Sequence, residues 1–422
     1  MELKAERIKI GEGINLNLIN IDKFKSNLLS LYFLIPLNRE DITKNALLPL
    51  VLKRGTKELN TNLRIQTKLE EMYGADFSVS VNKKGERLVI RFTIEGPRED
   101  FVKDKGYIFE MINFIKSMVY DPYLEDGIFS NQYLEQEKEI LIRLIEGKIN
   151  EKRDYAIIRC IEEMCKNEKF SIYPLGYVED LNSIDSKILY NQYTKILSQA
   201  PIELFYVGQY GKKVEEYLIN AFKMERKNIF RIERESITGN VQVKNMVYED
   251  MDINQGKLVI GYRTGIPYED NLYNGLLVAS DILGGGPNSK LFKNVREKES
   301  LAYYIGSKVY KYKSIVLIDG GIEFNNFEKT IEIIRSQIDN MKMGVFSDED
   351  IEISKRSIKT SIESIKDSAF LISEFFLSNV LSKDARSLGE TLTDIDKVTK
   401  EDIVKASKKI NVDTIYFLRN PK

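Results

Sequence analysis

The chain has 422 residues, of which 43% are hydrophobic, so it is long enough for two large domains that each bury a core. Its 63 basic and 64 acidic residues nearly cancel, which argues against nucleic acid or an anionic membrane as the main partner. It has no histidine, which excludes serine–histidine and cysteine–histidine catalysis and leaves only cysteines and carboxylates for a zinc site.

The first half of the chain predicts an α+β arrangement. A hydrophobic strand at 26–37 leads to an apolar helix that ends at a glycine within 46–56. A second, amphipathic helix then runs into two alternating strands across 64–96, with NKKGE as the turn between them. Paired helices follow, and a strand at 202–210 completes the pattern.

The second half repeats this order. The predicted elements follow the same order as in the first half: a strand at 256–266, an apolar helix with glycines at 274–286, and a helix followed by strands at 290–322. Paired helices and a last strand at 414–420 follow. The repeat predicts an α+β fold of two homologous domains, each an antiparallel-rich sheet packed with helices. We place these domains at 1–222 and 246–422, joined by a charged linker at 223–245.

The two cysteines predict neither a disulfide nor a metal site. Cys160 and Cys165 lie five residues apart in one predicted helix and face different sides of it, so we expect buried free thiols. The amino terminus lacks the pattern of a leader, and no apolar run approaches about eighteen residues. We therefore expect a cytoplasmic protein with no membrane partner.

The segment GGGPNSK at 284–290 raises the question of a phosphate-binding loop. It fits neither the Walker pattern nor the G-x-G-x-x-G fingerprint of dinucleotide-binding proteins. Gly284, Gly285 and Gly286 are better explained by a helix end and a backbone that is either flexible or closely approached. A nucleotide-binding enzyme remains an alternative that a nucleotide titration would reveal.

Arg296 and Tyr303 are the candidate binding residues. They lie seven residues apart, so they share a face if the helix persists, or else occupy the helix end and the start of the next strand. The paired donors of arginine and the hydroxyl of tyrosine suit the carbonyl or carboxylate oxygens of a peptide. In the alternative, Arg296 pairs with Glu297 or Glu299 on a solvated surface and Tyr303 belongs to the core.

The string LGGGPNSKLFKNVREKESLAYYIGS at 283–307 closely resembles the second-domain signature of the insulinase, pitrilysin and mitochondrial processing peptidase family, whose active members carry an inverted zinc motif. YPLGYVEDLNSI at 173–184 resembles another family segment, and the resemblance spans essentially the whole chain. It implies the family's duplicated fold. The signature positions that match are Ser289, Leu291, Phe292, Val295, Arg296, Glu297, Leu301, Ala302 and Tyr303.

Active members of the family carry H-x-x-E-H on the first helix of the first domain. The segment that follows the motif in the family matches Arg54, Gly55 and Thr56 here and sets the register. The two histidine positions then fall on two apolar residues and the glutamate on a proline, namely Ala46, Leu50 and Pro49. We expect the proline to kink or interrupt the helix.

The family's third zinc ligand, a glutamate on a later helix, falls on Leu144 in this register. Glu139 and Glu146 lie close by, but an isolated carboxylate does not hold catalytic zinc against water. The resemblance therefore implies that this chain has lost the zinc chemistry, binds no metal or other cofactor and is not an enzyme by itself.

In two-subunit members, one subunit carries zinc and the other contributes an arginine and a tyrosine beside a glycine-rich loop. These roles carry over to Arg296, Tyr303 and Gly284–Gly286. The implied function is a non-catalytic subunit that binds an unfolded peptide and pairs with a zinc-bearing homologue. The alternative is a structural or chaperone-like silent homologue, such as those associated with modification of bacterial elongation factor P.

Overall fold

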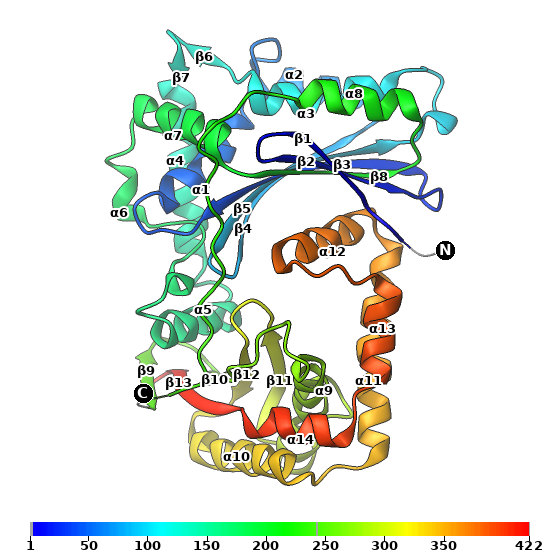
Figure 1. Ribbon diagram of the computed structural model, residues 1–422. Helices are drawn as coiled ribbons and strands as arrows, with labels where there is room; N and C mark the ends of the chain where they lie inside the picture. The colour runs from blue at the N-terminus through cyan, green and yellow to red at the C-terminus, as the bar shows by residue number, and fades with distance from the viewer. Residues whose placement is uncertain (1–2, 242–243, 422) are drawn as a thin grey trace. The chain divides into compact units, whose positions relative to one another are not determined.

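The computed structural model describes residues 3–241 and 244–421, which form two compact units (Figure 1). Residues 242 and 243 of the predicted linker, and residues 1, 2 and 422 of the predicted domains, lie outside the described residues. The first unit contains the residues up to Glu146, Ile172–Arg234 and Ile365–Leu381. The second unit contains Gly147–Ser171, Glu235–Ser364 and the residues from Ser382 onward.

The first unit is built on a six-stranded sheet in the order β1-β2-β8-β3-β5-β4. Among the described strands of this sheet, only β2 and β8 pair in parallel. The long strands β3 and β5 are mostly buried, and the burial of β3 explains its nearly continuous apolar sequence. The strands are β1 (Glu6–Gly11), β2 (Ile14–Asn20), β3 (Ser26–Pro36), β4 (Asp76–Lys84), β5 (Arg87–Pro97) and β8 (Ile202–Gly208).

Helices cover both faces of the first sheet. Figure 1 shows α3 and α8 on one face and α12 on the other. On the α12 face, the hydroxyls of Tyr32 and Ser373 lie 2.9 Å apart, and the Arg91 guanidinium lies 4.3 Å from the centre of the Phe370 ring. The elements of this unit are α1 (Ile42–Leu52), α2 (Asn62–Glu71), η1 (Glu99–Phe101), α3 (Tyr107–Tyr120), β6 (Leu124–Glu125), β7 (Ile128–Phe129), α4 (Asn131–Gly147), α6 (Val178–Leu181), α7 (Ser186–Gln199), α8 (Lys212–Phe222) and α12 (Ala369–Ser382).

The second unit has a five-stranded sheet in the order β11-β12-β10-β13-β9. Its only parallel pair within the described residues is β13–β9. The strands are β9 (Asn245–Asp250), β10 (Gly256–Arg263), β11 (Ala302–Tyr310), β12 (Ile315–Ile322) and β13 (Asn411–Arg419). The helices are α5 (Lys152–Met164), η2 (Lys169–Ser171), α9 (Tyr273–Gly284), the π-helix η3 (Phe292–Lys298), η4 (Phe324–Asn326), α10 (Phe327–Met343), α11 (Asp348–Glu363), η5 (Ser364–Asp367), which spans the boundary between the units, α13 (Leu388–Asp396) and α14 (Lys400–Lys408).

Alternate residues of β10 pack against different helices. Leu258 and Ile260 join the cluster formed with α9, α10 and α14, whereas Val259 joins the cluster formed with α5. Because successive side chains of a strand point to opposite faces, α5 covers the face opposite α9. Cys160 lies in α5 and Cys165 is the residue that follows this helix. Both are buried free thiols, as the sequence predicted.

The two sheets have the same topology. Apart from β1, the order β2-β8-β3-β5-β4 of the first unit repeats as β9-β13-β10-β12-β11 in the second. In each sheet, the last strand of that half of the sequence, β8 or β13, pairs in parallel with an early strand, β2 or β9. This early strand precedes the first long antiparallel strand of the half. The predicted α+β fold of two homologous domains is confirmed, although the sequence did not predict β1, β2 or β9.

The halves of the sequence exchange one helical segment each. Relative to the predicted domains 1–222 and 246–422, residues 147–171 with α5 pack in the second unit and residues 365–381 with most of α12 pack in the first. The boundary between Arg234 and Glu235 falls inside the predicted linker. None of the described helices is long and apolar enough to cross a membrane.

A buried charge network ties the α5 segment to the second sheet. The side chain of Lys313, in the turn between β11 and β12, has no exposed surface; it pairs with Glu168 and donates to the Ser236 carbonyl at 2.6 Å. Arg263 of β10 also donates to Glu168, at 2.5 Å, and to Asp413 at 2.7 Å. Burial by itself would raise the pKa of Glu168, but the hydrogen bonds from Lys313 and Arg263 lower it below its usual value.

Candidate functional site

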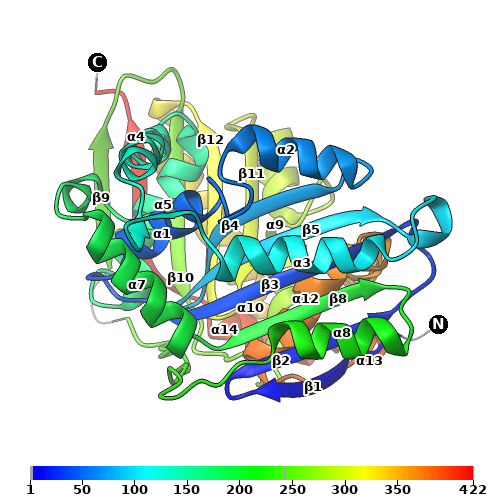
Figure 2. The ribbon, with the colours of Figure 1, turned by 90° about the horizontal axis from the view of Figure 1, so that it is seen from above.

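The apolar residues of the 283–307 segment anchor it in the second unit. Leu291, Val295 and Leu301 are all buried in the cluster beneath α9 and β11. The backbone amide of Leu301 donates to the Val295 carbonyl at 2.9 Å, which ties the start of β11 to the π-helix η3. The polar residues of the segment are therefore held on a packed base; Figure 2 shows α9 and β11 from above.

Arg296 lies on η3 and is exposed. Its guanidinium lies 4.7 Å from the centre of the Phe292 ring, one π-helical turn earlier. It makes no ion pair with any described residue, and Glu299 pairs with Lys329 at 2.5 Å instead. A run of π-helix is rare in proteins and occurs most often at functional sites, because the wider turn places side chains where an α-helix would not.

Tyr303 is the extra residue of a bulge at the start of β11. Ala302 pairs with Ile322 and Tyr304 with Gly321, which leaves Tyr303 without an opposite residue. A bulge redirects a side chain, and Tyr303 is 74% exposed. The structure thus contradicts the alternative of a core Tyr303 and an ion-paired Arg296. It places the two residues at the helix end and on the following strand.

Close packing explains two of the three glycines of this segment. None of Gly284, Gly285 and Gly286 has a positive φ. A Cβ on Gly284 would lie 2.5 Å from the Ser307 amide nitrogen, so this glycine lets α9 lie directly against β11. A Cβ on Gly285 would lie 2.1 Å from Asp281 Oδ2, whereas one on Gly286 would meet nothing within 4 Å.

We expect Gly284→Ala to destabilise the protein by about 1–3 kcal/mol, because the added methyl group meets backbone that cannot move without separating α9 from β11. Gly286→Ala is the matched control and should change stability by less than about 0.5 kcal/mol. Thermal unfolding followed by circular dichroism would compare them. Equal melting temperatures would contradict the packing role of Gly284.

The positions at which the sequence predicts the family's zinc motif are apolar in the structure. Nine of the eleven residues of α1 are buried, among them Ala46 and Pro49, while Leu50 is partly buried. Of the two effects expected of Pro49, a kink or an interruption, the interruption is wrong, since α1 continues to Leu52 and the Lys53 amide bonds to the Pro49 carbonyl at 3.1 Å. Burial of this helix outweighs the cost of about 3 kcal/mol for a proline inside it.

Helix α4 supplies no metal ligand to these positions. Leu144 is 48% exposed, and Glu139 and Glu146 point to solvent. The buried carboxylate of this helix is Glu137, which pairs with Arg54. Burial raises the pKa of Glu137, and the Arg54 pairing only partly offsets this. Nothing in the sequence pointed to this pair beyond two opposite charges near the motif.

Zinc does not fit these residues, because a methyl group, a proline ring and two leucine side chains offer it no donor atom. Within residues 3–241 and 244–421, no group of three or more cysteines and carboxylates is arranged to hold a metal ion.

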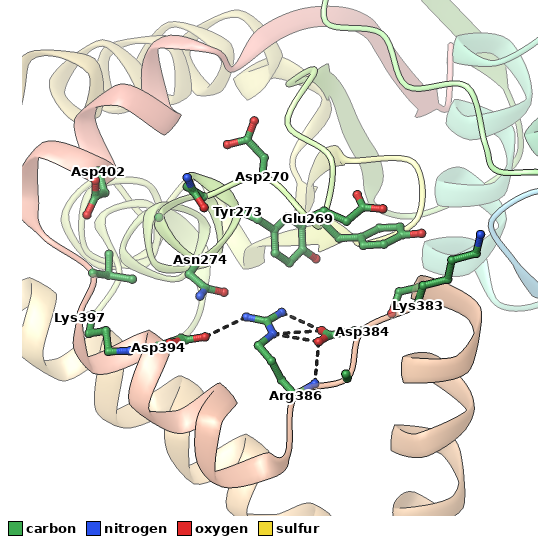
Figure 3. Close-up of a pocket in the computed structure, with 16 residues that line it drawn as sticks. Glu269, Asp270, Tyr273, Asn274, Lys383, Asp384, Arg386, Asp394, Lys397 and Asp402 are labelled. Carbon is green, nitrogen blue, oxygen red and sulfur yellow. Dashed lines mark hydrogen bonds and ion pairs between the residues drawn. The ribbon is translucent and has the colours of Figure 1, made fainter. Parts of the chain in front are cut away.

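A separate cavity of about 490 Å³ lies in the second unit between the start of α9 and the segment from Ser382 to α14 (Figure 3). Arg386 lies between two carboxylates, 2.7 Å from Asp384 and 3.2 Å from Asp394. These charges satisfy one another, and none of the predicted site residues lines the cavity.

Comparison with known proteins identifies the family. Residues 183–358 match the Peptidase M16 inactive domain. Over 409 residues, 96% of each chain, this chain is 37% identical to the probable inactive metalloprotease YmfF of Bacillus subtilis (strain 168). The chain belongs to the M16 peptidase family. This M16 chain is also 26% identical over 150 residues, 35% of its length and 36% of the relative's, to the uncharacterized zinc protease YmxG of the same bacterium.

The fold of this M16 chain matches a solved structure over nearly its whole length. The crystal structure of a conserved protein from Enterococcus faecalis V583 superposes with a TM-score of 0.90 at 26% identity, covering 99% of this chain and 98% of the other. The family predicted from the 283–307 segment is confirmed. The chain is an inactive M16 homologue.

Proposed function

We propose that this M16 chain is the non-catalytic, substrate-binding subunit of a heterodimeric zinc peptidase, and that a zinc-bearing homologue is its partner. The observation that carries the proposal is the state of Arg296 and Tyr303. Both are exposed, neither has an ion pair among the described residues, and both stand on elements fixed by buried neighbours. A protein that needed them only for folding would have engaged them internally.

The two side chains suit the backbone of an extended peptide. The guanidinium offers paired N–H donors in one plane, and the tyrosine hydroxyl offers a single donor. When a peptide bond is attacked, negative charge grows on its carbonyl oxygen, and fixed donors stabilise that charge more than they stabilise the ground state. The stacking of Arg296 on Phe292 limits the guanidinium's motion without using its N–H groups.

Two of the similar proteins support the pairing. B. subtilis has one relative described as a probable inactive metalloprotease and another described as a zinc protease. The zinc of the proposed complex belongs to the second kind of chain, since the corresponding positions here have no donor.

We expect the purified chain to contain no stoichiometric zinc and to cleave no unfolded protein, such as casein, by itself. Mixed with a zinc-bearing M16 homologue from its own organism, it should form a one-to-one complex in size-exclusion chromatography and increase casein cleavage. Chelator-sensitive cleavage by the isolated chain would refute the proposal. Failure to bind either the homologue or casein would favour the structural-module alternative.

A further inference from the structure

A small cavity lies beside the glycine segment, within the second unit. It has a volume of about 100 Å³, and three elements form its walls: the end of α9, the loop that follows it, and α11. The walls present two carboxylates, one amide and three hydroxyls, and no lysine or arginine lines them. The residues are Asp281, Ile282, Gly285, Gly286, Pro287, Asn288, Ser289, Asp350, Ile353, Ser354 and Ser357.

The two carboxylates differ in their partners. Asp350 closes the capping box of α11 by accepting from the Ser347 amide at 2.9 Å. Although burial opposes it, the hydrogen bonds from Ser347 lower the pKa of Asp350, and the nearby charges of Lys290 and Lys293 act in the same direction. Asp350 is therefore already engaged.

Asp281 has no cation among the described residues. The Ser357 hydroxyl donates to its Oδ2 over a long 3.3 Å, and hydrogen bonds from the Ser354 and Ser357 hydroxyls only partly offset the effect of burial on its pKa. Asp281 is only partly exposed, and burial raises its pKa. A partly buried carboxylate is costly unless it is paired, so this one is suited to a cation that comes from a ligand.

Gly285 makes room for this carboxylate. Its φ of −80° is one that any residue adopts, so backbone conformation does not require glycine here. A Cβ at this position would lie 2.1 Å from Asp281 Oδ2 and 2.4 Å from its Cγ. The absence of a side chain at 285 thus lets the carboxylate lie against the loop and face the cavity.

We propose that this cavity binds a primary ammonium group of the peptide, with Asp281 as its counter-ion and the cavity hydroxyls as further acceptors. An ammonium group has three N–H donors and no acceptor, which matches one carboxylate surrounded by hydroxyls. The group comes from a lysine side chain or from the amino terminus of the peptide. This inference rests on the proposed function and assigns a specificity to the same loop.

The test uses the full chain and four versions of one short unstructured peptide, labelled with a dye at the carboxyl end. The versions combine a lysine or acetyl-lysine at the centre with a free or acetylated amino terminus. In fluorescence anisotropy, we expect at least one free ammonium group to tighten binding about tenfold over the fully acetylated peptide. Comparison of the two singly acetylated versions shows which source of ammonium the cavity takes.

Asp281→Asn should abolish this preference, and Gly285→Ala should reduce it because the new methyl group displaces the carboxylate while leaving its charge. Glu349→Gln, at an exposed acid of α11 outside the cavity, is the matched control and should leave the preference unchanged. Arg296→Ala should instead weaken all four peptides by the same factor. A preference that survives in Asp281→Asn overturns the inference and leaves the proposed function in place.

A second measurement does not depend on peptide binding. Saturation-transfer NMR with n-butylammonium chloride should give a signal with the wild-type chain that Asp281→Asn removes. Equal signals from the two proteins overturn the inference, and so does a wild-type signal that sodium or potassium chloride suppresses more strongly than tetramethylammonium chloride at the same ionic strength. If no peptide binds but the butylammonium signal depends on Asp281, the ammonium site in the cavity is supported and the proposed function is refuted.

Discussion

Arg296→Ala is expected to lower peptide turnover about 100-fold in the complex with a zinc-bearing M16 homologue, while the complex itself stays intact. The guanidinium makes no ion pair within the described chain, so its removal breaks no internal salt bridge and leaves the buried base of Leu291, Val295 and Leu301 unchanged. The loss should fall mainly on kcat if the donor acts on the developing oxyanion, and on KM if it holds the peptide before reaction.

Tyr303→Phe tests the same site with a smaller change, because it removes one hydroxyl from a side chain that is 74% exposed and leaves the bulge in place. Lys298→Ala, at an exposed cation on the same π-helix, is the control for loss of positive charge. Steady-state kinetics of the reconstituted complex would measure all three. Turnover that is unchanged in both Arg296→Ala and Tyr303→Phe would contradict the site assignment.

Glu168→Ala should destabilise the second unit by about 3–5 kcal/mol, because it leaves the fully buried Lys313 without its carboxylate. Arg263 keeps Asp413, so the main cost is the loss of the ion pair between Lys313 and Glu168. Hydrogen exchange of the β12 amides would report the change within this unit. The double variant Glu168→Ala/Lys313→Met should recover most of the loss, whereas Glu401→Ala, in an exposed pair with Lys405, should cost less than about 1 kcal/mol.

The same network predicts the direction of a pH effect. The pKa of Glu168 is lowered in the folded protein, so its contribution to stability is present above its ordinary value of 4.5 and is lost as the pH falls through the lowered folded value. Protection of β12 should therefore fall in acid more steeply in the wild type than in the double variant. Parallel pH profiles would show that Glu168 does not carry this dependence.

Periodicity predicted the repeated order of strands and helices because the same burial pattern occurs in both halves. It did not predict the exchange of α5 and the α12 segment, since an apolar helix face shows that a helix is buried but not which sheet it covers. The short strands β2 and β9 were missed because their pairing with β8 and β13 is long-range and parallel. The helix was not interrupted at Pro49 because the burial of α1 outweighs the low helix propensity of proline.

The sequence predicted which residues form the candidate site, but not how they are arranged in space. The spacing of Arg296 and Tyr303 left two placements open, and a π-helix and a bulge, which have no simple sequence pattern, decide between them. The sequence did not indicate Asp281 as a binding residue, because it lies within an apolar helix. Its position four residues before Gly285 was the available signal, and that spacing gains its meaning only from the structure, in which a Cβ at 285 would meet the Asp281 carboxylate.

Because the two halves of the sequence exchange helical segments, neither half contains all the elements of one unit. The backbone passes between the two units at five places, after residues 146, 171, 234, 364 and 381. A fragment cut at the linker would lack the helix that covers one face of its own sheet and carry a helix whose apolar side has no sheet. A chain that held only one half would need a second copy to complete each core, so this polypeptide has the connectivity of a domain-swapped dimer fused into one chain.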